Sequence, residues 1–198
     1  TKSILSGLFK TYKFILTIPF YILKLAINTK NKFKKEEAEK EVKKKRESIR
    51  AKYQKFETLE TLNGNFQDWE TKLENSDSTI GIILGARGTG KSALAIKIFE
   101  NIYKKKKAPL YAIGFKPDAM PSWIHVIDSI DKIKNNSYIL IDEGGILFSS
   151  RSSMSKPNKI LSDLLLIARH KNLNILFISQ NSSNLEINIL RQADYLLL

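Results

Sequence analysis

The chain has 198 residues and a formal net charge of +13, which arises from 33 Lys/Arg against 20 Asp/Glu. It contains no cysteine and two histidines, which excludes disulfide bonds and thiolate metal sites and argues against a histidine-based metal site. This length accommodates one domain with an additional segment, or two small domains. Residues 1–55 hold 16 of the Lys/Arg but only 5 of the Asp/Glu, so the rest of the chain is close to neutral. A basic N-terminal arm indicates an anionic partner, either phospholipid or nucleic acid.

Residues 1–29 are both apolar and basic. Their longest uncharged stretch, Phe14 to Leu23, has ten residues, and Pro19 would kink a helix there. A membrane span needs about 20 mostly apolar residues. The pattern therefore favours a helical segment that lies in a membrane interface over one that crosses the membrane. Docking of this segment on a partner protein or on the core remains an open alternative.

Residues 30–58 are highly charged and contain neither glycine nor proline, which predicts a long solvated helix. Beside a membrane-bound segment, this helix would face an anionic leaflet; otherwise it is a charged spacer without a binding role. Residues 59–78 are predicted to be a linker, since Asn63-Gly64-Asn65 is a turn signal. Within it, Phe66 and Trp69 are expected to pack at the core edge, and a second candidate role for Trp69 is stacking on a nucleotide base.

From residue 79 onward, apolar runs of strand length alternate with helical patterns, which predicts an α/β domain over 79–198 with a parallel sheet and helices on both faces. No initiator Met is present, and the chain stops inside an apolar run, which is consistent with a fragment at one or both ends. The expected strands are 79–84, 110–113, 138–143, 173–180 and 195–198, and the expected helices are 93–103, 185–190 and one that begins at Pro157. Residues 115–123 are expected to form a loop, and 124–133 a short extended piece followed by a short helix.

The clearest chemical motif follows the first predicted strand and reads Gly85-Ala86-Arg87-Gly88-Thr89-Gly90-Lys91-Ser92. It fits G-x-x-x-x-G-K-[ST], the phosphate-binding P-loop, and it lies between a strand and a helix as that motif requires. Glycines let successive N–H groups point at phosphate oxygens, and the start of the following helix adds partial positive charge. We expect Lys91 to reach the β- and γ-phosphates of ATP and the Ser92 hydroxyl to ligate Mg²⁺. The alternative is a chance glycine-rich turn.

Two later strands end in polar residues that can complete such a site. The run Tyr138-Ile139-Leu140-Ile141-Asp142-Glu143 is typical of a Walker B strand. Asp142 is expected to hold Mg²⁺ through water, and Glu143 is expected to polarise the attacking water as general base. Gln180, at the end of another strand, is expected to sense the γ-phosphate or the attacking water; a simple strand cap is the alternative. The pairing of both acids favours ATP hydrolysis over binding alone.

Together with Ala168-Arg169-His170-Lys171-Asn172 and Arg191-Gln192-Ala193-Asp194, these motifs resemble the FtsK/HerA superfamily of DNA-pumping ATPases. Within it, residues 79–198 are most similar to the zonula occludens toxin-like (Zot) and viral genome-packaging ATPases. The resemblance implies a RecA-like P-loop NTPase sheet in which the strand ending in Gln180 lies between the Walker A and Walker B strands. It also implies a ring, often hexameric, in which an arginine enters the neighbouring ATP site. Arg169 and Arg191 are the candidates, with Arg151 third, and loop 149–156 is a candidate lining for a DNA channel.

These observations lead to two hypotheses of different classes. The first is a Mg²⁺-dependent ATPase that moves DNA in packaging or extrusion, as a ring on the cytoplasmic face of a membrane or in the cytoplasm, in a virus, phage or mobile element. The second is a membrane-anchored, NTP-dependent assembly or signalling module that does not move DNA. A small-molecule kinase fits less well, because no lid or acceptor pocket is evident. Since the 79–198 domain is nearly neutral, charge that grips DNA must be local or come from the arm.

Overall fold

The computed structural model describes residues 24, 27–61, 64–142, 144, 157–180 and 187–198, and at 157–160 and 187–188 it describes the backbone alone. The chain divides into two compact units, Thr1–Lys45 and Arg46–Leu198. The predicted apolar segment therefore lies almost entirely outside the described residues.

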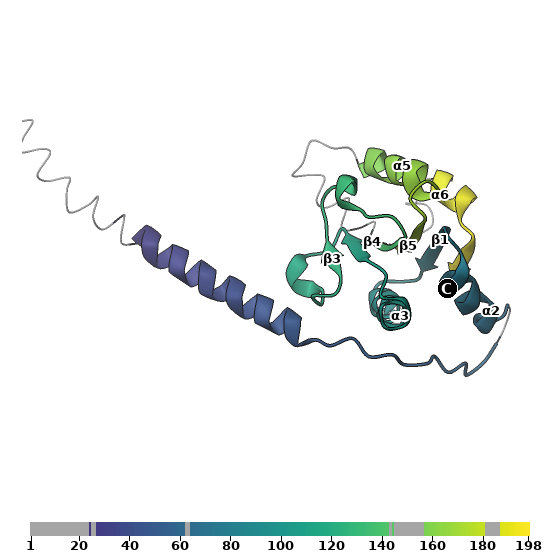
Figure 1. Cartoon of the computed structure of the whole chain (residues 1–198), viewed down its shortest axis with the longest axis horizontal. Helices are drawn as coiled ribbons and strands as arrows, with labels where there is room; N and C mark the ends of the chain where they lie inside the picture. Colours follow the sequence, from purple (N-terminus) through teal and green to yellow (C-terminus); the bar gives the residue numbers. More distant parts are fainter. Residues whose placement is uncertain (1–23, 25–26, 62–63, 143, 145–156, 181–186) are drawn as a thin grey trace, which may run out of the picture. The chain divides into compact units, whose positions relative to one another are not determined.

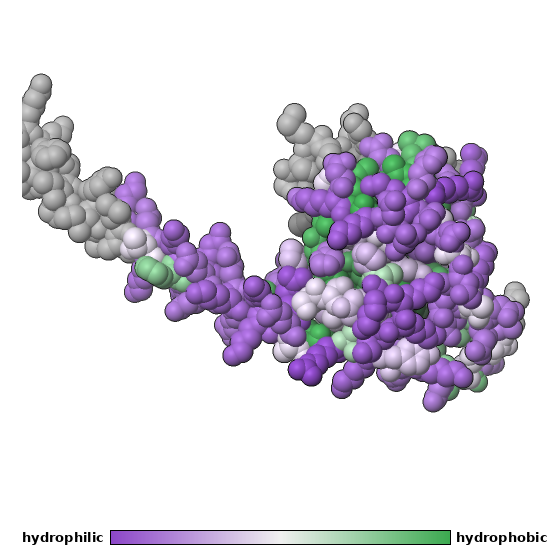
Figure 2. Space-filling model, viewed as in Figure 1, coloured by the Kyte–Doolittle hydropathy of each residue, from purple (hydrophilic) through white to green (hydrophobic). Residues whose placement is uncertain are grey.

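The charged part of the arm is helical over residues 27–48, and its side chains up to residue 45 are exposed and mostly hydrophilic (Figure 2). The helix was expected to continue to residue 58, but the chain is neither helix nor strand from residue 49 to 58. An ion pair with an N–O distance of 3.9 Å joins Lys35 to Glu39 one turn later, a spacing that supports a helix by a few tenths of a kcal/mol. Among the described residues, no helix is both long and apolar enough to cross a membrane.

The second unit is built on a six-stranded sheet in which every described pair of neighbouring strands is parallel. Its strands are β1 (Thr79–Leu84), β2 (Leu110–Ile113), β3 (His125–Val126), β4 (Ser137–Asp142), β5 (Leu173–Ser179) and β6 (Tyr195–Leu197), in the order β3-β2-β4-β5-β1-β6. The strand that precedes Gln180, β5, lies between β1 and β4, as the resemblance implied. This arrangement confirms the predicted RecA-like α/β fold.

Helices cover both faces of this sheet, because alternate residues of each strand point to opposite sides. On one face, Ile82, Ile139 and Phe177 are buried in a core shared with α5 (Pro157–Ala168) and α6 (Ile187–Gln192). On the other face, Ile83 and Leu140 are buried in a core shared with α2 (Phe66–Asn75) and α3 (Lys91–Lys106). Figure 1 shows these two helix pairs on opposite sides of the strands. The short 3₁₀ helices η1 (Pro117–Ala119) and η2 (Ile130–Lys132) flank β3.

The region predicted as a linker differs most from its expected structure, because it contains α2. Asn65, which belonged to the predicted turn, caps this helix: its Oδ1 accepts from the N–H groups of Gln67 at 2.9 Å and Asp68 at 3.3 Å. The apolar residues Phe66, Trp69 and Leu73 recur at helical spacing, and Leu73 is buried. An apolar stripe of only three residues in an otherwise polar stretch is a weak sequence signal for a helix. Phe66 and Trp69 pack together at 5.0 Å between ring centroids, as expected for the core edge.

Gly81 in β1 lies under the ring of Tyr195 in β6, its parallel neighbour. A Cβ atom at this position would collide with the phenol ring. We expect Gly81→Ala to lower the free energy of unfolding by about 1–3 kcal/mol, the usual range for overpacking a core. Urea unfolding measures the loss. The double variant Gly81→Ala/Tyr195→Ala should lose less than the sum of the two single variants, and additive losses would contradict this packing.

Tyr138 in β4 contributes a pH-dependent part of the stability. Its hydroxyl donates to the backbone oxygen of Leu73 in α2 at 3.2 Å, and burial raises the pKa of Tyr138 to about 12. Since the folded state favours the neutral phenol, this contribution is complete below pH 10 and is lost as the pH rises toward 12. Burial also raises the pKa of Tyr195.

We therefore expect Tyr138→Phe to lower the free energy of unfolding by about 1 kcal/mol at pH 8, the usual net value of one hydrogen bond. Above pH 10, the variant should lose stability less steeply than the unmodified chain, and Tyr195 should account for part of the slope that remains. Urea unfolding at several pH values checks both effects. Parallel curves for the two proteins above pH 10 would contradict the assignment.

Candidate nucleotide-binding site

The P-loop joins β1 to α3, at the edge of the sheet where the parallel strands end. Gly88 and Gly90 have φ angles of 82° and 87°, in the left-handed region that glycine adopts without strain. Gly90 is the N-cap of α3 and offers no side chain to cap the helix. The first N–H groups of a helix lack partners within the helix, so they are available to an anion bound in the loop.

Lys91 is folded back over the loop in this structure. Its Nζ donates to the backbone oxygens of Gly85 at 2.7 Å and Ala86 at 2.6 Å. The Thr89 hydroxyl donates to the same Ala86 oxygen at 2.9 Å. These contacts hold the Lys91 side chain against the backbone of the loop. Phosphate oxygens could replace the two carbonyl oxygens as acceptors without a change in the fold.

The P-loop forms one wall of a cleft of about 560 Å³. Ends of β4 and β5 complete it, so residues from three separate parts of the sequence meet there. The lining residues are Arg87, Gly88, Gly90, Lys91, Ser92, Ala93, Asp142, Gly144, Ile178, Ser179 and Gln180. The cleft thus brings together the predicted Mg²⁺ ligands, Ser92 and Asp142, with the predicted sensor, Gln180. Their roles in binding and catalysis stay predictions.

Asp142 is half-buried at the end of β4. Its Oδ1 accepts from the N–H group of Gly144 at 3.1 Å, which orients the carboxylate. Among the described residues, no group of three or more His, Cys, Asp or Glu could hold a metal ion by itself. Mg²⁺ does not require such a group, because it commonly takes one or two protein oxygens together with water and nucleotide phosphates. The Ser92 hydroxyl and the Asp142 carboxylate fit that donor set.

Ser179 also lines the cleft, although it was not predicted as a site residue. Ser179 is buried at the end of β5, directly before Gln180. A polar residue that ends an apolar strand is the sequence signal that could have identified it. Two predicted residues, Glu143 and Arg151, lie outside the described part of the chain.

The two other candidate arginines do not line the cleft. Arg169 follows α5 and precedes β5, and Arg191 lies in α6, which precedes β6; both are exposed. They therefore lie near the edge where the strands begin, about 20 Å from the strand ends for strands of six or seven residues. Neither arginine is placed to reach the nucleotide of its own subunit, and action on a neighbouring subunit stays a prediction. Trp69 does not line the cleft either, and its ring contacts Tyr195 at 5.6 Å.

Residues 99–195 match the family model Zonular occludens toxin (Zot). This part of the chain is similar to the Zot family, which is related to the P-loop NTPases, and the predicted Zot-like resemblance is confirmed. The matched residues include Asp142 and Gln180 but begin after the P-loop, which therefore stands as separate support for a nucleotide site. No curated protein matches the chain.

Proposed function

We propose that this chain, which is similar to the Zot family over residues 99–195, is a Mg²⁺-dependent ATPase. The observation that carries the proposal is the cleft in which Lys91, Ser92, Asp142 and Gln180 converge. The start of α3 and the ends of β4 and β5 together provide a glycine-rich loop, an ammonium group, a hydroxyl and a carboxylate. This set is suited to bind a nucleoside triphosphate with its metal ion. The related family supports the same chemistry.

Each residue then has a distinct task. The loop N–H groups and Lys91 bind and orient the phosphates, while Ser92 and Asp142 hold Mg²⁺, which neutralises charge on the phosphates when bound. Glu143, the residue after Asp142, takes a proton from the attacking water as general base. Gln180 follows the strand between the Walker A and Walker B strands, so it can report whether the γ-phosphate is present.

The work that hydrolysis drives is, in this proposal, the movement of DNA in virion packaging or extrusion. Three features favour it: the Zot match, the basic arm of residues 1–55, and the distance of Arg169 and Arg191 from their own cleft. An arginine that acts in a neighbour's site requires association of subunits, and we propose that this assembly is a homo-oligomeric ring, often a hexamer in this superfamily. The arm would place it at the cytoplasmic face of a membrane.

The second candidate is an NTP-dependent assembly module that does not move DNA. The near-neutral charge of residues 56–198 favours it, since a DNA motor usually needs strong basic patches. The rate of ATP hydrolysis by the full chain, with and without single- and double-stranded DNA, separates the two. The DNA-motor proposal expects stimulation by DNA and an oligomeric native mass. Hydrolysis that neither DNA nor assembly stimulates would favour the assembly module.

Membrane association has its own test. In flotation with vesicles that contain anionic phospholipid, we expect the full chain to rise with the lipid, because the apolar segment inserts and the lysines bind head groups. A chain that lacks residues 1–28 should stay with the soluble fraction at physiological salt. Vesicles of neutral lipid are the control and should bind less. A full chain that never floats would contradict the proposed anchor.

A further inference from the structure

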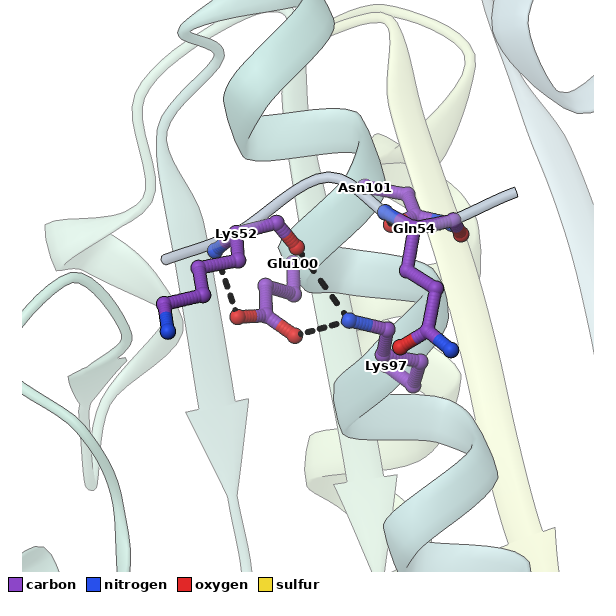
Figure 3. Close-up of polar contacts among 5 residues, drawn as sticks. All are labelled: Lys52, Gln54, Lys97, Glu100 and Asn101. Atoms are coloured by element: carbon purple, nitrogen blue, oxygen red, sulfur yellow. Dashed lines mark hydrogen bonds and ion pairs between the residues drawn. The ribbon is translucent and has the colours of Figure 1, made fainter. Parts of the chain in front are cut away.

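Residues 49–57, which we call the strap, form neither helix nor strand, yet they are held against the outer face of α3 (Figure 3). The strap belongs to the same compact unit as the sheet. It follows directly after the helix of the arm. The contact therefore lies within the second unit and joins the strap to the helix that begins in the P-loop.

The contacts are made by side chains of α3 with the backbone of the strap. The N–H group of Lys52 donates to Glu100 Oε1 at 2.7 Å, and Lys97 Nζ donates to the backbone oxygen of Lys52 at 3.2 Å. The N–H group of Gln54 donates to Asn101 Oδ1 at 3.0 Å, and Asn101 Nδ2 donates to the backbone oxygen of Gln54 at 2.7 Å. Both backbone groups of two alternate residues are thus satisfied by α3.

Asn101 shows why the strap is part of the folded unit. The residue is 3% exposed, and its neighbours in the helix, Phe99 and Ile102, belong to the hydrophobic core. A buried carboxamide needs hydrogen-bond partners, and both of those found for Asn101 belong to the backbone of Gln54. If the strap detached from α3, the Asn101 side chain would lose both hydrogen-bond partners. Lys97 and Glu100 would keep each other, at 2.7 Å.

The strap also reaches the strand on the other side of the P-loop, through a series of aromatic rings. Phe56 contacts Phe66 at 5.5 Å between centroids, and Trp69 continues the series to Tyr195 at 5.6 Å. The Tyr195 ring lies over Gly81 in β1. The strap is therefore connected to both elements that flank the P-loop, α3 directly and β1 through these rings.

We propose that the outer face of α3 formed by Lys97, Glu100 and Asn101 is a docking site that recognises the backbone of the strap, and that strap docking and nucleotide binding favour each other. The structure with the strap docked has the nucleotide cleft formed. In the proposed function, Lys91, in the first turn of α3, exchanges the carbonyl oxygens of Gly85 and Ala86 for phosphate oxygens when nucleotide binds. A conformation of α3 that binds nucleotide more tightly therefore also binds the strap more tightly. By reciprocity, a docked strap raises the affinity for nucleotide by the same factor. This inference rests on the proposed function.

A matched pair of proline variants of the full chain tests the docking. Gln54→Pro removes the N–H group that Asn101 accepts, whereas at Lys55 no hydrogen bond of the N–H group is found among the described residues. Lys55→Pro therefore introduces the same ring without loss of a backbone hydrogen bond found among these residues, and Gln54→Ala changes the side chain alone. Hydrogen exchange of the Lys52 amide should be fast in Gln54→Pro, but should stay slow in Lys55→Pro and Gln54→Ala. Equal exchange in the two proline variants would overturn the docking site.

Titration of the same variants with Mg²⁺ and a fluorescent ATP analogue tests the coupling. Gln54→Pro should bind about fivefold or more weakly than Lys55→Pro, within the usual range for linked sites, and the analogue should slow Lys52 exchange in the unmodified chain. Glu100→Ala removes the acceptor of the Lys52 N–H group and should also weaken binding of the ATP analogue. This variant replaces Gln54→Pro in the test if Gln54→Pro does not fold. Equal affinities of Gln54→Pro and Lys55→Pro for the ATP analogue would overturn the coupling but not the docking site. An unmodified chain that binds no Mg²⁺–ATP would overturn the proposed function, and the coupling with it.

Discussion

Lys91→Ala is expected to weaken Mg²⁺–ATP binding by roughly 30-fold or more, because loss of one partner of a close charge pair costs about 2–5 kcal/mol and 1.4 kcal/mol corresponds to a factor of ten. The ammonium group lies at the mouth of the cleft, and its acceptors in this structure are two loop carbonyl oxygens. Its loss would leave the loop N–H groups to bind the phosphates without a fixed positive charge.

Isothermal titration with ATP and Mg²⁺ measures the effect. Lys104→Ala is the matched control, since Lys104 is an exposed lysine in the last turn of the same helix. It should bind ATP as the unmodified chain does. Thermal unfolding should show that both variants are folded. Unchanged affinity in a folded Lys91→Ala variant would rule out the P-loop as the phosphate site.

Glu143→Gln should have the second large effect, on turnover and not on affinity. A positioned general base typically contributes about 10²–10⁴ in rate, and an amide of the same size cannot accept the proton of the attacking water. We therefore expect hydrolysis to fall by that factor while Mg²⁺–ATP still binds. Phosphate release at saturating ATP gives the rate, and titration gives the affinity.

Asp142→Asn separates the roles of the two neighbouring acids. Because the asparagine is a weaker metal ligand, Asp142→Asn should raise the Mg²⁺ concentration needed for half-maximal activity. Glu143→Gln should leave this Mg²⁺ concentration unchanged. If Glu143→Gln retained full turnover, Glu143 would not be the base. The search would then move to other groups that line the cleft.

Much of the fold was predictable because its signals are local. The longer strands β1, β2, β4 and β5 are mostly apolar runs, and Gly88 and Gly90 occur where the loop requires positive φ. The meeting of Asp142 and Gln180 was also predictable, since both follow strands of one parallel sheet, whose ends lie at the same edge.

The strap and α2 were not predictable in this way. The strap is held by residues 45 to 48 positions later in the chain, through its backbone, so its own side chains carry no pattern that signals the contact. In α3, Asn101 resembles any polar residue of a helix until the fold buries it. Helix α2 depends on one capping residue and a short apolar stripe, which the polar residues around them conceal.

The most direct test of the central claim is the rate of phosphate release from ATP by the full chain, with Mg²⁺ and with the metal removed by chelation. We predict turnover that requires Mg²⁺ and that falls at least about 100-fold in Glu143→Gln, as expected for loss of a general base. A chain that binds Mg²⁺–ATP but hydrolyses it no faster than Glu143→Gln would contradict the assignment of this cleft as an ATPase site.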